Sequence, residues 1–144
     1  MIVILFCLLP LQTLFAGEKT IGNIKNLTGD VKVIRNSKEF LPVLGGELFN
    51  KDTLKTGSDG TVGILLLDNT IFSLGHDSEL KLDIFHFDPP NKSFSLVTQM
   101  VKGTFIFISG LIGKLSPESV ELLTPDGSVT IRGTKLAIQV KGDK

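Results

Sequence analysis

The sequence predicts an all-β domain, and three observations carry that prediction. Short segments alternate apolar and polar residues, which is the period of two expected of half-buried strands. Glycine, asparagine and proline turns separate these segments at short intervals. No segment shows the apolar period of a helix over a useful length. Strands of this length and spacing fit a sandwich, a roll or a short irregular solenoid, and spacing alone does not choose among them.

The N-terminal residues Met1–Ala16 stand apart from the rest of the chain. The run Ile2–Leu9 is apolar, Pro10 ends it, and a small residue precedes Gly17. We interpret residues 1–16 as a secretory signal peptide cleaved after Ala16, which leaves 17–144 as the mature domain. An uncleaved anchor is the alternative, but the segment is interrupted by Pro10 and is shorter than the roughly 20 residues that span a bilayer. Cleavage would remove Cys7, the only cysteine, and leave no stable membrane span.

The first half of the mature chain gives four strand predictions. Residues 31–33 alternate two valines with a lysine. Residues 62–67 form a continuous apolar run, which predicts a strand covered on both faces. Asp68 and Asn69 predict a tight turn into a strand at 71–74. Leu80, Leu82 and Ile84 alternate with polar residues and predict one buried face of the next strand.

The second half continues the same pattern. The two prolines within 88–92 predict a turn with no capacity for helix. Alternation resumes at 94–98, and 105–108 reads as a short buried strand. Residues 111–115 could form a single helical turn. The last predicted strands are 120–122, 129–131 and 136–140.

Charge and length restrict the function classes. The 144 residues are one domain by length, with 15 basic and 15 acidic residues and a formal net charge of zero. A neutral chain has no electrostatic footprint for nucleic acid and no polybasic patch for anionic membranes.

The search for catalytic chemistry is negative. His76, Asp77 and Ser78 have the residue types of a triad, but neighbouring strand residues point to opposite faces and cannot converge. We predict a polar turn there. His86 and Asp88 share one strand face, but two ligands make a poor metal site. We therefore expect no enzyme activity, no metal and no cofactor.

Two aromatic residues leave an alternative open. Phe85 and Phe87 lie opposite the predicted buried face of their strand. They either cover the far side of the sheet as core residues or form an exposed contact patch.

A break between two alternating runs supplies the candidate site. Gly133 separates the last two predicted strands, where a residue without Cβ permits a bulge or sharp bend. Arg132 is the only charged residue of the first run. It either fixes the bend through a local contact or binds an anion or partner.

Four stretches, in this order, resemble the FecR protein domain family: Asp52–Gly60, Leu66–Gly75, Lys102–Phe105 and the closing Thr124–Thr134 with its Ile-Arg-Gly-Thr element. The resemblance covers roughly residues 29–140. It implies a compact β-solenoid-like domain that senses a signal outside the cytoplasm. It also makes Arg132, Gly133 and Thr134 the candidate partner-binding residues.

The best-known members of that family relay siderophore-receptor status through a transmembrane helix to a cytoplasmic anti-sigma segment. In this sequence no such segment precedes the apolar run and no later transmembrane helix is expected. We therefore expect an exported, non-enzymatic binding or signal-sensing module in the periplasm that meets an envelope protein or an unknown ligand. The alternatives are a structural envelope scaffold without its own ligand and a truncated, membrane-anchored anti-sigma-type sensor.

Overall fold

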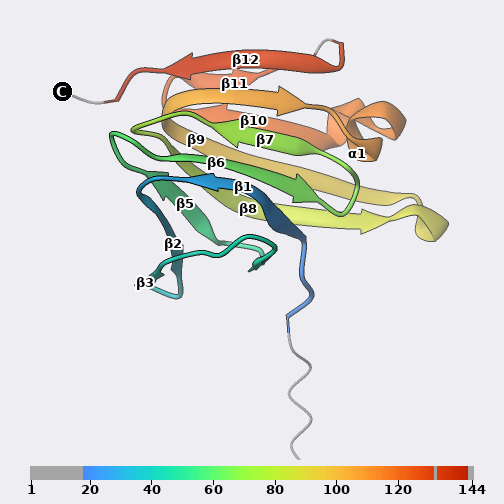
Figure 1. Cartoon of the computed structure of the whole chain (residues 1–144). Coiled ribbons are helices and arrows are strands. Elements are labelled where there is room, and N and C mark those ends of the chain that lie inside the picture. Colours follow the sequence, from blue (N-terminus) through green and yellow to red (C-terminus); the bar gives the residue numbers. More distant parts are fainter. Residues whose placement is uncertain (1–17, 132, 143–144) are drawn as a thin grey trace, which may run out of the picture.

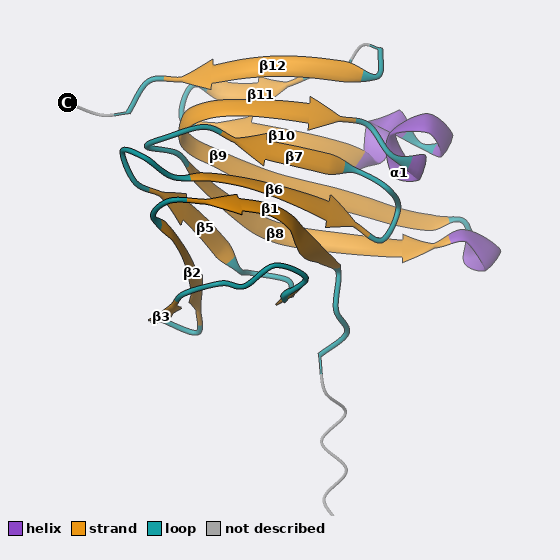
Figure 2. Ribbon diagram, in the orientation of Figure 1, coloured by secondary structure: helices purple, strands orange, loops and turns teal. Residues whose placement is uncertain are grey.

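The computed structural model describes residues 18–131 and 133–142, and these residues confirm the all-β prediction (Figures 1 and 2). The predicted signal peptide and Arg132 lie outside the described residues. Within the described ranges, twelve strands form one curled sheet: β1 (Gly22–Thr28), β2 (Val31–Arg35), β3 (Lys38–Phe40), β4 (Glu47–Leu48), β5 (Thr53–Thr56), β6 (Thr61–Leu66), β7 (Ile71–Leu74), β8 (Glu79–Asp88), β9 (Ser93–Ile108), β10 (Val120–Thr124), β11 (Gly127–Val129) and β12 (Lys135–Val140).

The strand order along the sheet is β3-β2-β5-β8-β9-β7-β6-β1-β4, and β10 and β12 both add to β9. Neighbours are antiparallel except β10 and β9, which run parallel. The sheet curls like half a barrel, which is nearest to the roll among the predicted alternatives (Figure 2).

The 16-residue strand β9 is the spine of the sheet. Its first part pairs with β8 and β10, and its last part pairs with β7 and β12. The change of partner occurs at Gly103, whose φ is +109°. A Cβ at Gly103 would lie 2.1 Å from the Oγ and 2.4 Å from the Cα of Ser78. The predicted strands 94–98 and 105–108 are therefore one strand that bends where only glycine fits.

The core lies inside the curl. Its largest fully buried side chains are Phe72, Phe105, Phe107, Leu48, Leu54, Ile64, Leu66, Leu80, Leu82, Leu96, Met100 and Ile112. Within this core the rings of Phe72 and Phe107 lie 5.1 Å apart. The buried run 62–67 is confirmed as β6 up to Leu66, whereas Leu67 is exposed beyond the strand end.

The predicted buried face of β8 is wrong at one position. Ile84 is 48% exposed, while Phe85 is buried at 7%. The pairing of β8 with β9 shifts register between Leu82 and Ile84, and such a bulge moves the side chains beyond it to the other face. Phe85 and Phe87 therefore belong to the core side: Phe85 is buried, and Phe87 packs against the core beside Phe94.

The short helical segments differ slightly from prediction. Leu111–Leu115 forms α1, the predicted single turn. Pro89–Asn91 forms a 3-10 turn where no helix was expected, because proline is compatible with the first positions of a helical turn. A second 3-10 turn covers Pro117–Ser119. No helix among the described residues has the length and apolar character needed to cross a membrane.

Candidate functional site

The predicted partner-binding residues lead into β12, at one side of the sheet (Figure 1). Gly133 is exposed, has a φ of +84°, and has no atom within 4 Å of a built Cβ. Thr134 is also exposed, and its carbonyl oxygen accepts a 2.8 Å hydrogen bond from the Ser109 N–H. The prediction for Arg132 lies outside the described residues. Gly133 and Thr134 thus form an exposed turn whose left-handed backbone favours glycine.

Strand β12 presents an unpaired backbone edge. Among the described strands it pairs with β9 alone. In an antiparallel pair every second residue directs its N–H and C=O groups toward the neighbouring strand. The hydrogen bond from the Ser109 N–H to the Thr134 carbonyl shows that Thr134 faces β9, so Leu136 and Ile138 do so as well. The N–H and C=O groups of the residues between them, Lys135, Ala137 and Gln139, face away from β9. Such an edge can accept an extended strand from another chain.

The side chains of β12 keep this edge in place. Leu136 and Ile138 pack against the core, and Val140 is buried. Lys135, Ala137 and Gln139 are exposed on the opposite face. Lys135 is the one charged residue within β12, and an edge lysine discourages unspecific strand pairing. The edge is therefore accessible, and a single lysine is its protection against unspecific strand pairing.

Two other residues of the family-like stretches, Asp68 and Thr56, form hydrogen bonds that stabilise the fold. Asp68 is fully buried, and its carboxylate accepts hydrogen bonds from the backbone and hydroxyl of Thr70 and from the Ile112 N–H. It thereby fixes α1 to the turn between β6 and β7. Thr56 donates its hydroxyl to the Gly75 carbonyl at 2.6 Å and accepts the Ser78 N–H at 2.8 Å.

The three residues with the types of a triad form a turn, as predicted. Ser78 is buried, and its hydroxyl oxygen accepts the Thr104 N–H at 3.0 Å. His76 is exposed and contacts Asp77 at 3.0 Å. The serine hydroxyl is held by backbone groups and has no imidazole partner, so these three residues lack the geometry of a catalytic triad.

Metal-binding groups do not gather in the described part of the chain. No cluster of three or more His, Cys, Asp or Glu side chains occurs there. His86 and Asp88 line an open hollow together with Lys19 and Phe87. This pair supplies two ligands at most.

A second surface feature was not predicted from the sequence. Phe40, Leu41, Val43 and Leu44 are 39%, 75%, 66% and 65% exposed; Phe40 ends β3, and the other three lie in the segment that leads from β3 to β4. We call residues 40–46 the apolar loop. The run of apolar residues was visible in the sequence, but its exposure was not.

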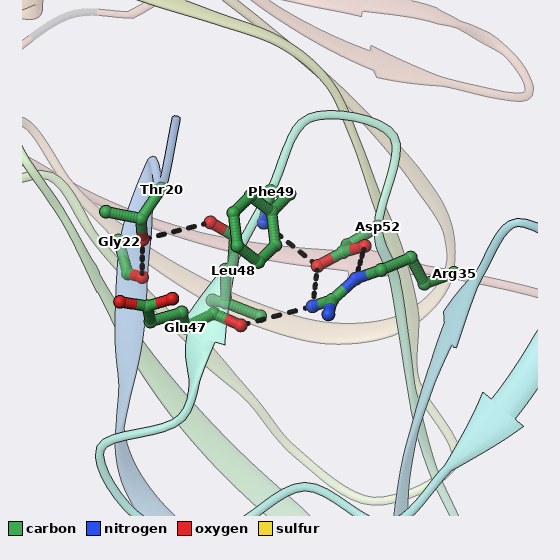
Figure 3. A network of polar contacts seen from close by, with 7 residues as sticks. All are labelled: Thr20, Gly22, Arg35, Glu47, Leu48, Phe49 and Asp52. Carbon is green, nitrogen blue, oxygen red and sulfur yellow. Dashed lines mark hydrogen bonds and ion pairs between the residues drawn. The ribbon is translucent and has the colours of Figure 1, made fainter. Parts of the chain in front are cut away.

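The apolar loop has a fixed base (Figure 3). The guanidinium of Arg35 lies over two rings, 4.8 Å from the centroid of Phe40 and 4.6 Å from that of Phe49. Its Nε and Nη2 donate to the two carboxylate oxygens of Asp52 at 2.8 and 2.7 Å. The hydrogen bond with Asp52, and then the negative charge of Asp52, raise the pKa of Arg35 despite partial desolvation. Arg35 therefore stays charged, paired and stacked.

The loop backbone is also tied to β1. The Gly45 N–H donates to the Ile24 carbonyl at 2.8 Å, and the Ile24 N–H donates to the Gly46 carbonyl at 3.0 Å. A turn closes the tip, with the Gly46 N–H bonded to the Val43 carbonyl at 2.9 Å. The apolar side chains are therefore presented from a hydrogen-bonded turn.

Comparison with known proteins gives one match. A protein-family model described as FecR protein matches residues 52–144. No curated protein and no solved structure matches the chain. The matched residues include β12 and its edge, whereas the apolar loop precedes them.

Proposed function

The chain belongs to the FecR protein family, and on that premise we propose that it is a non-enzymatic, signal-sensing binding module that works outside the cytoplasm. The family is one of signalling and sensing domains of anti-sigma-type regulators, typically with a periplasmic part. The apolar N-terminal segment, interpreted as an export signal, supports the same location.

The open edge of β12 carries the proposal. The outward N–H and C=O groups of this edge can hydrogen-bond to another strand. An extended segment of an envelope protein would pair with them as an added antiparallel or parallel strand. The Gly133–Thr134 turn stands at the start of this edge and would meet the residue that enters or leaves the added strand. Recognition of this kind requires no catalytic group and no cofactor.

The experiment removes one outward donor without touching the inner ladder. Ala137→Pro deletes an N–H that faces away from β9, a place where an edge strand tolerates proline. Ala137→Ser keeps the donor and is the matched control. Each variant is used as bait, by reversible cross-linking, on the envelope fraction of the producing cells.

We expect Ala137→Pro to lower recovery of the partner at least about tenfold, because a lost hydrogen bond and the ring both oppose strand addition. Ala137→Ser should recover it like the wild type. Amide exchange at Lys135 and Gln139 should slow when the partner is bound. Equal recovery by the proline variant would exclude the β12 edge as the contact.

A further inference from the structure

The apolar loop has no role in the proposed function, because it lies on the opposite side of the molecule from β12 (Figure 1). Its four apolar side chains are all partly or largely exposed: Phe40, Leu41, Val43 and Leu44. Pro42 completes the run, so no side chain from Phe40 to Gly46 carries a charge or a hydrogen-bonding group. Contiguous exposed apolar residues in a water-facing loop mark a contact surface.

The positive charge of Arg35 at the base of the loop is already paired. The Arg35 guanidinium is bound by Asp52, donates to the Glu47 carbonyl at 3.1 Å, and is covered by two phenyl rings. The aromatic residues are thus engaged with Arg35, and the exposed tip itself is aliphatic. Protein hot spots favour aromatic and arginine anchors, which this tip does not offer.

The size of the patch also argues against a protein occupant. A stable protein interface removes roughly 800 Å² of surface on each partner, far more than a tip of three or four side chains provides. A lipid bilayer has no such requirement, because aliphatic side chains partition into it without a matching pocket.

The position of the chain before β1 supports the same occupant. The apolar run Ile2–Leu9 precedes the domain in the sequence, and the described chain begins at Glu18, just before β1. There the Ile21 N–H donates to the Leu48 carbonyl at 2.8 Å, and Leu48 belongs to β4, the strand directly after the apolar loop. While the apolar N-terminal segment is held in a membrane, before the cleavage predicted after Ala16, the domain is tethered at its β1–β4 end, the end that carries the apolar loop. We propose that the apolar loop inserts Leu41, Val43 and Leu44 into the interfacial region of a lipid bilayer.

The test uses the absence of tryptophan and tyrosine from the sequence. Leu44→Trp places a single fluorophore at the tip of the loop in the full chain. Leu115→Trp is the control, because Leu115 is 61% exposed on α1, outside the loop. Each variant is titrated with phosphatidylcholine vesicles and with phosphatidylcholine–phosphatidylglycerol vesicles, and brominated lipids serve as quenchers.

We expect a blue shift and quenching at position 44 on both kinds of vesicle, and neither effect at position 115. The triple variant Leu41→Ser/Val43→Ser/Leu44→Ser should weaken vesicle binding at least about tenfold relative to Leu111→Ser/Leu115→Ser. Circular dichroism checks that both variants fold.

Three outcomes would overturn the proposal. One is vesicle binding in which Trp at position 44 is neither shifted nor quenched. Another is equal binding by the triple variant and its control. A third is a blue shift at position 44 that grows with protein concentration without lipid, which would assign the loop to a second copy of the chain.

Discussion

Arg35 and Asp52 together bridge the two ends of the strand order. Arg35 lies on β2, next to the terminal strand β3, and its Nη2 donates to the carbonyl of Glu47 on β4, the strand at the other end. Asp52, with a fully buried side chain, receives two hydrogen bonds from Arg35 and a third, of 2.9 Å, from the Phe49 N–H. The pair therefore holds the curl of the sheet and the base of the apolar loop at once.

Removing the carboxylate should loosen that closure. Asp52→Ala removes the acceptor of two Arg35 hydrogen bonds and of the Phe49 N–H, and breaking a buried pair is costly. Because Arg35 keeps 29% of its side chain exposed, we expect a loss of about 2–4 kcal/mol in the free energy of unfolding. Urea denaturation measures it.

The matched variant Arg35→Lys keeps the charge but loses the two-bond geometry and the stacking on both rings. We expect about 1–3 kcal/mol of destabilisation. A cycle with Asp52→Ala should show strong coupling. Additive effects of the two substitutions would show that the pair does not act as a unit.

The bend of β9 is open to an equally direct test. Gly103→Ala introduces a Cβ against the Ser78 backbone and requires an alanine at a φ of +109°. We expect at least about 3 kcal/mol of destabilisation or failure to fold. Gly127→Ala is the control, since its φ is +147° but no atom lies within 4 Å. A similar cost for both would mean that the contact with Ser78 is unimportant.

The fold class was predictable from the sequence because alternation, turn residues and absent helical periodicity are all local signals. The sequence could not show that 94–98 and 105–108 are one strand, because the bend depends on a contact between Gly103 and Ser78, far apart in the chain. It also could not reveal β4, whose two residues are too short for any period.

The family motifs were recognisable in the sequence, but the structural roles of their residues were not. Asp52 and Thr56 stood in a stretch that resembles the family and Asp68 in a predicted turn, but their partners are set by tertiary contacts such as those of Asp52 with Arg35 and Asp68 with Ile112. The exposure of the apolar loop was hidden for the same reason. The apolar composition of Leu41–Leu44 is typical of core residues. In the structure the neighbouring Phe40 ring packs on Arg35 and a turn closes at Gly46, and the side chains at the tip of the loop stay exposed.

The bulge in β8 predicts that substitution by alanine is costly at Phe85 and well tolerated at the adjacent Ile84. Phe85→Ala empties a buried site and should cost about 3 kcal/mol or more, whereas Ile84→Ala should cost less than about 1 kcal/mol because Ile84 is 48% exposed. Thermal or urea unfolding compares them. The reverse order would restore the simple alternation that the sequence suggested.

Glu118 gives a prediction for acid pH. Hydrogen bonds from its own backbone N–H and from the Ser116 hydroxyl, the latter at 2.8 Å, hold the pKa of Glu118 below its ordinary value. A depressed carboxyl pKa stabilises the fold above the pKa of the unfolded chain, and this contribution is lost as pH falls through the folded value. A carboxyl titration by NMR should show the low pKa, and Ser116→Ala should raise it. An unchanged titration in Ser116→Ala would exclude the hydroxyl as a cause.

The N-terminal segment makes the last prediction. Ile21 is already hydrogen-bonded to Leu48 in the sheet, so cleavage after Ala16 leaves a spacer of a few residues and removes no described contact. We therefore expect cells to yield a product that begins at Gly17, as read by mass spectrometry of a C-terminally tagged chain. Ala16→Phe should block processing, because signal cleavage needs a small residue at that place. The blocked chain should stay in the membrane fraction, where the β1–β4 edge and its apolar loop would face the lipid. If the wild-type chain instead remains in that fraction with Met1 at its start, residues 1–16 are an anchor, and the membrane-anchored sensor becomes the better description.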